Sequence, residues 1–329
     1  MLLTMGLGAL ASAQARGEHG TWSFIIDNDM AFGTDQRYTN GVRLGWLAPA
    51  AERVGVADGG LSKHLRDALA PLPFVGLAGH RHSAAISLTQ VMVTPDDIEA
   101  TKLLPDQAPY FGYLGAGLTL YAWNETQYHA LAISLGVVGP DSMADSVQRR
   151  VHRWAGVKEP QGWHNQVGGR LTADLSYLYG HRVWKQRWGA GQGSDLALNY
   201  DLTLGSPVTS AAISGVWRWG RNLPDSFNVY AVDGGGEGAL LSLAERPARS
   251  GWFVYGGAAG TLLAYNTIER STRETHNLSW RKWNASLLVG AAIYRGNWQV
   301  GLSLAADSSP VHQDDRPLSY GSLYLIWTP

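Results

Sequence analysis

The feature that most constrains this chain is an alternation of apolar and polar side chains that recurs over much of its length. Between Asp195 and Leu204 the even positions are apolar or aromatic, and the odd positions are polar or small. The segment from Arg281 to Arg295 repeats the pattern, and the turn at residues 295–297 leads into another alternating run. Successive side chains of a strand point to opposite faces, so this pattern predicts long antiparallel strands joined by tight turns.

The alternation fits either a soluble β-sandwich with one wet face or a membrane β-barrel with an apolar outer wall. Strand length favours the barrel, because the runs approach the roughly 9 to 11 residues of a membrane-spanning strand. Composition agrees, since only 16% of residues are charged while the chain holds 40 Gly, 14 Trp and 14 Tyr. Aromatic residues also lie near strand ends, as in interfacial girdles: Trp184, Trp188, Trp217, Trp219, Trp252, Trp283 and Trp298. The predicted fold is all-β, an antiparallel transmembrane β-barrel of about 12 strands with a short helix in a rim loop.

The N-terminus predicts export. Leu2 to Leu10 forms a short apolar core, and small residues up to Ala15 offer cleavage positions, so residues 1–15 are interpreted as a signal peptide and residues 16–329 as a single barrel domain. Other apolar runs are too short for a transmembrane helix. The net charge of −1 does not favour nucleic acid as a partner, and the absence of Cys excludes disulfides and thiolate metal sites.

An oxygen-rich connection joins the first two alternating runs, within residues 25–46. Such a density of side-chain oxygens suits a hard cation such as Ca²⁺, although a solvated loop with Asx turns is the alternative. Strand parity places Asp27, Asp29 and Thr39 on the inward face near the barrel rim. Asn28 has the outward parity, which requires the strand to end or bulge there.

A probable helix interrupts the strand rhythm within residues 139–166, from an N-cap at Asp141 to a C-cap at Gly156. One face carries Asp145, Gln148 and His152, which suggests a general base with orienting partners. A solvated surface histidine is the alternative. The opposite face carries an apolar stripe of Met143, Val147, Val151 and Trp154.

Arginines surround this histidine. Arg149, Arg150 and Arg153 form either a solvated helix face or a site for anionic headgroup phosphates, which the planar guanidinium group binds well. The common hydrolase, metalloprotease and nucleotide-binding motifs do not occur in the sequence, and the other histidines lack zinc-ligand spacing. A Ser–His pair brought together only by the fold stays open.

The sequence contains several further short motifs: Asn28-Asp29, the run from Thr34 to Gly41, Gln90, Thr94-Pro95, the D-x-x-P-Y-x-G run from Asp106 to Gly112, the run from Gly136 to Pro140, Gln148-x-x-x-His152, Gly162-Trp163-x-Asn165-Gln166 and the run from Arg221 to Asp225. In this order and spacing, these motifs resemble the lipid A 3′-O-deacylase family of Gram-negative outer membranes. Most of these motifs lie within residues 22–170, and the later half matches mainly as strands.

The resemblance implies a twelve-stranded barrel with a site near its outer rim, which removes the 3′-linked acyloxyacyl group of lipid A with the help of Ca²⁺. By position it implies Asn28, Asp29, Thr39 and His152 as site residues. The family places a glutamate six residues after the histidine. Here Lys158 has that position, and Glu159 next to it could take the role.

The sequence therefore predicts an outer-membrane esterase in which His152 activates water, with Asn28, Asp29 and Thr39 beside it. Ca²⁺ is expected as the cofactor, with Asp29 and Glu159 as its ligands, and Arg149 and Arg153 are expected to bind lipid A phosphates. The expected partners are lipid A or lipopolysaccharide and the membrane. Two alternatives stay open: a non-catalytic pore or structural barrel, and a barrel phospholipase acting on glycerophospholipids.

Overall fold

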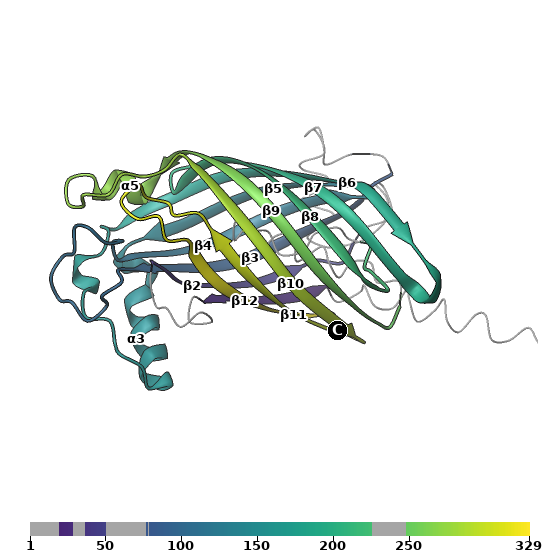
Figure 1. Cartoon of the computed structure of the whole chain (residues 1–329), viewed down its shortest axis with the longest axis horizontal. Helices are drawn as coiled ribbons and strands as arrows, with labels where there is room; N and C mark the ends of the chain where they lie inside the picture. The colour runs from purple at the N-terminus through teal and green to yellow at the C-terminus, as the bar shows by residue number, and fades with distance from the viewer. Residues whose placement is uncertain (1–19, 29–36, 51–76, 78, 226–247) are drawn as a thin grey trace, which may run out of the picture.

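The structure is a computed structural model, and it describes residues 20–28, 37–50, 77, 79–225 and 248–329. Within these ranges, twelve antiparallel strands form one closed barrel, in which sequence neighbours pair and β1 closes against β12 (Figure 1). The strands are β1 Thr21–Asn28, β2 Arg37–Leu47, β3 Arg81–Thr94, β4 Phe111–Trp123, β5 Gln127–Val138, β6 Arg170–Arg187, β7 Gln192–Gly205, β8 Val208–Arg221, β9 Ser250–Asn266, β10 Trp283–Arg295, β11 Trp298–Asp307 and β12 Leu318–Trp327. The predicted barrel is confirmed.

The side chains that alternate along each strand point in turn to the outside and to the interior of the barrel. On β7 the side chain of Leu202 is exposed on the outer face, whereas that of Asp195 is buried in the interior. On β10, Leu287 and Ile293 are exposed in the same way. The predicted tight turn is confirmed where Arg295 pairs with Trp298, and its central glycine adopts a left-handed φ of 59°. Closure leaves no free strand edge in the sheet.

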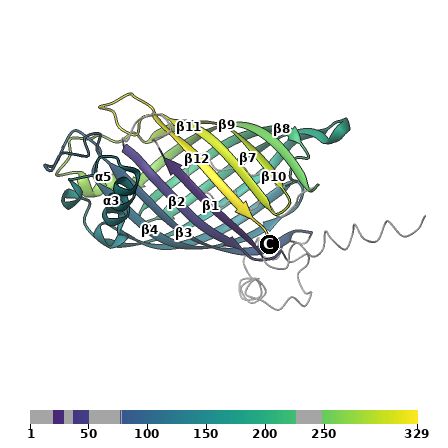
Figure 2. The same cartoon turned by 90° about the horizontal axis from the view of Figure 1, so that it is seen from below.

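The two ends of the barrel differ. Both the first strand's start and the C-terminus lie at one end, called here the terminal end, while α3 and α5 lie at the other, the helical end (Figure 2). Exposed tryptophans are concentrated towards the terminal end, as an interfacial girdle requires: Trp22, Trp184, Trp188, Trp217, Trp252, Trp298 and Trp327. Trp283 begins β10 at the opposite end.

Side chains fill the described interior. Tyr128, Phe253, Tyr294 and Tyr324 are all fully buried, and most of them belong to two apolar clusters inside the wall. The interior therefore resembles a packed core rather than a wide aqueous channel.

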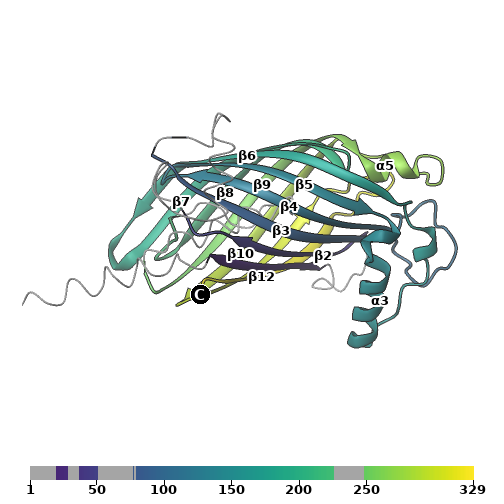
Figure 3. The ribbon, with the colours of Figure 1, turned by 180° about the vertical axis from the view of Figure 1, so that it is seen from behind.

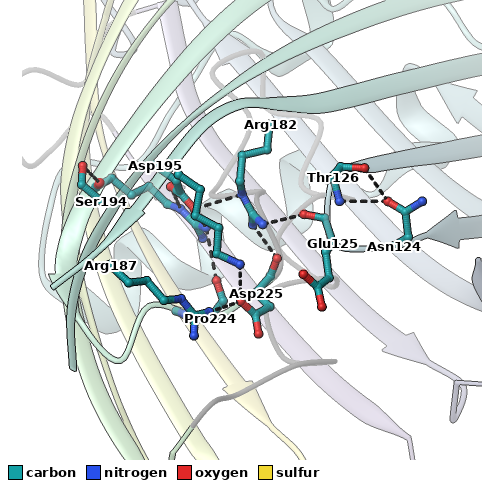
Figure 4. Close-up of polar contacts among 11 residues, drawn as sticks. Asn124, Glu125, Thr126, Arg182, Arg187, Ser194, Asp195, Pro224 and Asp225 are labelled. Carbon is teal, nitrogen blue, oxygen red and sulfur yellow. Dashed lines mark hydrogen bonds and ion pairs between the residues drawn. The ribbon is translucent and has the colours of Figure 1, made fainter. Parts of the chain in front are cut away.

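An ionic network ties the interior together at the terminal end (Figure 4). Arg218, which is 1% exposed, donates to both carboxylate oxygens of Asp195 at 2.8 and 2.5 Å. Arg182 forms a second ion pair with Asp195, at 3.2 Å, and donates to the carbonyl oxygens of Glu125 and Asp225 at 2.6 and 2.5 Å. The network thus joins β6, β7 and β8 to the β4–β5 turn and to the segment that follows β8.

Asp225 also belongs to this network through its side chain. Its carboxylate accepts hydrogen bonds from Lys185, at 2.9 Å, and from Arg187. Burial raises the pKa of Asp225, but the hydrogen bond from Lys185 and the positive charges of Lys185, Arg187 and Arg182 outweigh burial and leave the pKa below its usual value. Through Asp225, the segment that follows β8 is therefore held to β6 at the terminal end of the barrel.

Short helices punctuate the connections: η3 Pro140–Ser142, α3 Ala144–Ala155, η4 Trp163–Asn165, η5 Gly189–Gly191 and α5 Thr267–Thr272. The predicted C-cap at Gly156 is confirmed by its left-handed φ of 69°. The predicted N-cap at Asp141 is wrong. Asp141 lies in η3, and α3 starts after Met143, whose own left-handed φ of 57° separates the two helices. None of the helices in the described ranges is long and apolar enough to cross a membrane.

The signal peptide expected at residues 1–15 lies outside the described residues.

Candidate functional site

Helix α3 is rooted on the outer face of the barrel wall. Ile86 and Leu88 of β3 are exposed on that face, and Gln90 and Met92 have the same strand parity. The Gln90 side-chain amide donates to the Ser142 carbonyl oxygen at 2.8 Å. Met92 is buried in a cluster that also contains Ala144, the first residue of α3. The helix is therefore attached to the outside of the wall rather than to the mouth of the lumen.

Gly112 of β4 allows this close approach. It is the cross-strand partner of Met92, so it also faces outward. A Cβ atom at Gly112 would lie 2.2 Å from the Ser142 Oγ and 2.5 Å from the Ala144 Cβ. Ser142 is fully buried and donates to the Gly139 carbonyl oxygen at 2.6 Å, so it has little room to move. Only glycine fits between the wall and the base of α3.

We expect Gly112→Val to displace α3 while the barrel stays closed, because the added side chain pushes on the root of the helix and not on the interior. Whatever reaction depends on α3 should then slow by about 10²-fold, the typical cost of a misplacement of about 1 Å. The matched control is Ala116→Val, which places the same side chain at an exposed outward position of β4. Heat-modifiable migration on gels checks barrel closure, and full activity of a closed Gly112→Val barrel would contradict this role.

The buried face of α3 consists of Ala144, Gln148 and His152, one helical turn apart. The Trp163 indole donates to the Gln148 Oε1 at 2.8 Å. Trp163 is itself buried against the Tyr110 ring, with ring centroids 4.9 Å apart. The D-x-x-P-Y-x-G and G-W motifs thus form the scaffold that holds this face in place.

Gln148 has a second feature. Its side-chain Nε2 is buried and has no hydrogen-bond partner among the described residues. An unmade hydrogen bond in a buried amide is costly, so such a group commonly marks a place where a ligand or water binds. Because Trp163 holds the oxygen of this amide, the orientation of its NH₂ group is set in advance.

His152 lies in the last turn of α3 and is 5% exposed. Its Nδ1 lies 2.5 Å from the carbonyl oxygen of Lys158. The left-handed Gly156 turns the chain back and brings this carbonyl to the ring. An acceptor at Nδ1 assigns the proton to that nitrogen and leaves Nε2 as the basic one. The alternative of a solvated surface histidine is therefore wrong.

The partners expected for His152 differ from those observed. Asp145 pairs with Arg149 one turn along the helix instead of orienting the ring. The orienting group is the backbone carbonyl of Lys158, the position at which the resemblance implies a glutamate. The Lys158 side chain turns to Glu99, whose hydrogen bond and negative charge raise the pKa of Lys158.

Glu159 is the nearest candidate for the missing carboxylate. It forms an ion pair with Arg153, whose Nε lies 3.3 Å from the Glu159 Oε1. Both arginines expected to bind phosphate, Arg149 and Arg153, thus have carboxylate partners in this structure. The described ranges contain no group of three His, Asp or Glu side chains that could hold a metal ion.

The β1–β2 residues lie at the same end of the barrel as α3. Asp27 is 4% exposed and faces inward, as predicted. Asn28 is the last residue of β1 and shares the outward parity of exposed Trp22 and Phe24, so it lies on the face that carries α3. Asp29 lies outside the described residues.

Thr39 lies within β2 at a β-bulge. Tyr38 is opposite Val93 and Asn40 is opposite Met92, so Thr39 is the extra residue. The alternation that predicted an inward Thr39 does not continue through a bulge. Its side chain is outside the described part of the structure.

Comparison with known proteins bears on the whole chain. A family model described as "Outer membrane protein LpxR" matches residues 1–328. Among solved structures, LpxR from Salmonella typhimurium has a TM-score of 0.71 at 16% identity, covering 94% of this chain and 100% of that one. The β domain of the Bordetella autotransporter BrkA has a TM-score of only 0.45 at 11% identity, covering 94% and 99%. No curated protein matches the sequence.

The wall that faces outward with apolar side chains is therefore the membrane-facing wall of an outer-membrane barrel, and its twelve strands have the fold of a solved LpxR. Matched by that family model over nearly its full length, the chain belongs to the LpxR family of Gram-negative outer-membrane proteins.

Proposed function

We propose that this protein is an esterase that removes the 3′-linked acyloxyacyl chain from lipid A in the outer leaflet. The observation that carries the proposal is the buried His152, whose tautomer is set by the Lys158 carbonyl. It lies on a helix rooted on the lipid-facing side of the wall. A base in that place meets a membrane-anchored ester without requiring the acyl chains to leave the lipid.

In this proposal His152 Nε2 takes a proton from water, and the resulting hydroxide attacks the ester carbonyl carbon. The carbonyl double bond opens to an oxyanion, for which the Gln148 NH₂ group is a preoriented donor one helical turn away. Collapse of the intermediate expels the sugar oxygen, which takes the proton back from His152. The products are a fatty acid and a free hydroxyl on lipid A.

Asn28, Asp29 and Thr39 are proposed to position the ester and the water from the β1–β2 side. Arg149 and Arg153 are proposed to bind lipid A phosphates, which would exchange their present carboxylate partners for a phosphate of higher charge. Both arginines lie on α3, so this binding would align the substrate along the helix.

A role for Ca²⁺ is also proposed. The described side chains do not make a calcium site alone, so Asp29 would have to be its central ligand, with Glu159 released from Arg153 as a second. When bound, the cation would add positive charge next to the ester carbonyl. Because Lys158 stands where the resemblance implies a glutamate, the proposed site has one carboxylate fewer, and we expect it to bind Ca²⁺ weakly.

The packed interior argues against the alternative of a pore, since bulky side chains such as Tyr294, Tyr324 and Arg218 are fully buried within the barrel. A glycerophospholipase stays open as the second candidate, because a base at the lipid-facing wall would also reach glycerol esters.

Mass spectrometry of lipid A from cells that express the protein tests the proposal. The expected result is a species lighter by one acyloxyacyl group, with the glycerophospholipids unchanged. Lysophospholipids with intact lipid A would instead support the phospholipase. Unchanged lipids in cells with a correctly closed barrel would exclude both enzymes.

Chelation tests the metal separately. Excess EDTA should stop deacylation by purified protein in lipid vesicles, and added Ca²⁺ should restore it. Activity that persists in EDTA would remove the metal from the mechanism and leave the esterase in place.

A further inference from the structure

The surface of α3 is divided into three arcs, since each residue turns the helix by about 100°. The buried arc is the one that carries Gln148 and His152. Next to it lies an apolar arc formed by Met143, Val147, Val151 and Trp154, and beyond the buried arc on the other side lies a basic arc formed by Arg149, Arg150 and Arg153. The buried arc of α3 thus lies between the apolar arc and the basic arc.

Most of the apolar arc is exposed, whereas Val147 is partly buried and packs against the cluster that contains Met92 and Ala144. Trp154 is 89% exposed, and Met143 and Val151 are each at least half exposed. The predicted apolar stripe exists, but the polar side of the helix is the one that packs inward. An exposed apolar patch of this kind marks an interaction surface.

Helix α3 starts at the membrane-facing side of the barrel. The root of α3 lies on the outward face of β3 and β4, and the helix runs across the barrel axis and projects beyond the wall (Figures 1 and 3). The flanking strands β5 and β6 carry strongly exposed Leu135 and Leu171 on the same outer surface. The apolar arc therefore begins beside the lipid-facing wall.

We propose that α3 is an interfacial helix whose apolar arc inserts into the acyl chains of the outer leaflet. Its basic arc then lies at the level of the lipid phosphates, as in amphipathic helices that lie in the plane of a membrane. Trp154 suits this position because its ring is apolar and its N–H can reach the wet interface. Insertion would hold the buried arc, and with it His152, at the depth of the ester bonds.

The absence of Cys makes a direct depth measurement simple. Single changes Val151→Cys and Trp154→Cys on the apolar arc, and Ser146→Cys and Arg149→Cys away from it, each receive a nitroxide label. The full-length protein is placed in vesicles of phosphatidylethanolamine and phosphatidylglycerol. Collision rates with oxygen, which concentrates in acyl chains, and with a water-soluble nickel complex are then compared by electron paramagnetic resonance.

Labels at 151 and 154 should show a several-fold higher ratio of oxygen to nickel collisions than labels at 146 and 149. Leu135→Cys on the wall and Asp315→Cys in an exposed loop supply the lipid and water references. Ratios at 151 and 154 equal to that at 315 would overturn the proposal. The measurement does not depend on catalysis, so a water-exposed arc on an active enzyme, or an inserted arc on an inactive one, separates this proposal from the proposed function.

Discussion

His152→Gln should abolish deacylation, lowering the turnover number by about 10²- to 10⁴-fold, the usual contribution of a general base. Glutamine keeps a similar volume and can still donate to the Lys158 carbonyl oxygen, but it has no basic nitrogen to take the proton from water. The scaffold around α3 should therefore stay intact. The fraction of lipid A that loses its acyloxyacyl group, followed over time by mass spectrometry, measures the effect.

His164→Gln is the matched control. His164 lies in the same β5–β6 connection but is exposed, and its ring contacts the neighbouring Asn165 side chain at 3.3 Å. This variant should keep full activity. If His152→Gln also kept it, the base would have to be another residue.

Asp195→Ala should lower the free energy of unfolding by roughly 3–5 kcal/mol, the range found when one partner of a buried ion pair is removed. The Asp195 carboxylate lies between two guanidinium groups, those of Arg182 and Arg218, and all three side chains are almost fully buried. The change leaves two positive charges near each other inside the barrel with no carboxylate between them. Urea unfolding in lipid vesicles, followed by tryptophan fluorescence, measures the loss.

The control for this experiment is Asp315→Ala. Asp315 also pairs with an arginine, Arg281, but its side chain is 89% exposed. Exposed pairs contribute at most about 1 kcal/mol, so this variant should unfold close to the original midpoint. Equal effects of the two variants would show that the terminal-end network does not stabilise the barrel.

The strands were predictable because one physical rule covers them all. A barrel wall has lipid on one side and a packed interior on the other, so every strand must alternate, as the runs in β7 and β10 do. The end of α3 was predictable for a similar reason, since Gly156 takes a left-handed turn that glycine adopts without strain. The start of α3 was not, because Met143 adopts a left-handed conformation that its residue type disfavours.

The placement of Gln148 and His152 on one face of α3 was predictable from their spacing, whereas the contacts of that face were not. The group that orients His152 is a main-chain carbonyl, which every residue carries, so no sequence pattern announces it. The bulge at Thr39 is likewise invisible, because a single extra residue in one strand depends on the register of its neighbour.

The attachment of α3 to the outside of the wall, through Gln90 and Gly112, has a consequence for how such a protein meets its substrate. In the proposed function, a site on this helix would meet its substrate by diffusion within the leaflet, which is a search in two dimensions. Encounters would then depend on how densely the substrate is spread in the leaflet and how fast lipids diffuse past the helix, not on any concentration in the surrounding water. Membrane fluidity would therefore set the rate of capture in the proposed reaction, and a stiff leaflet would slow it.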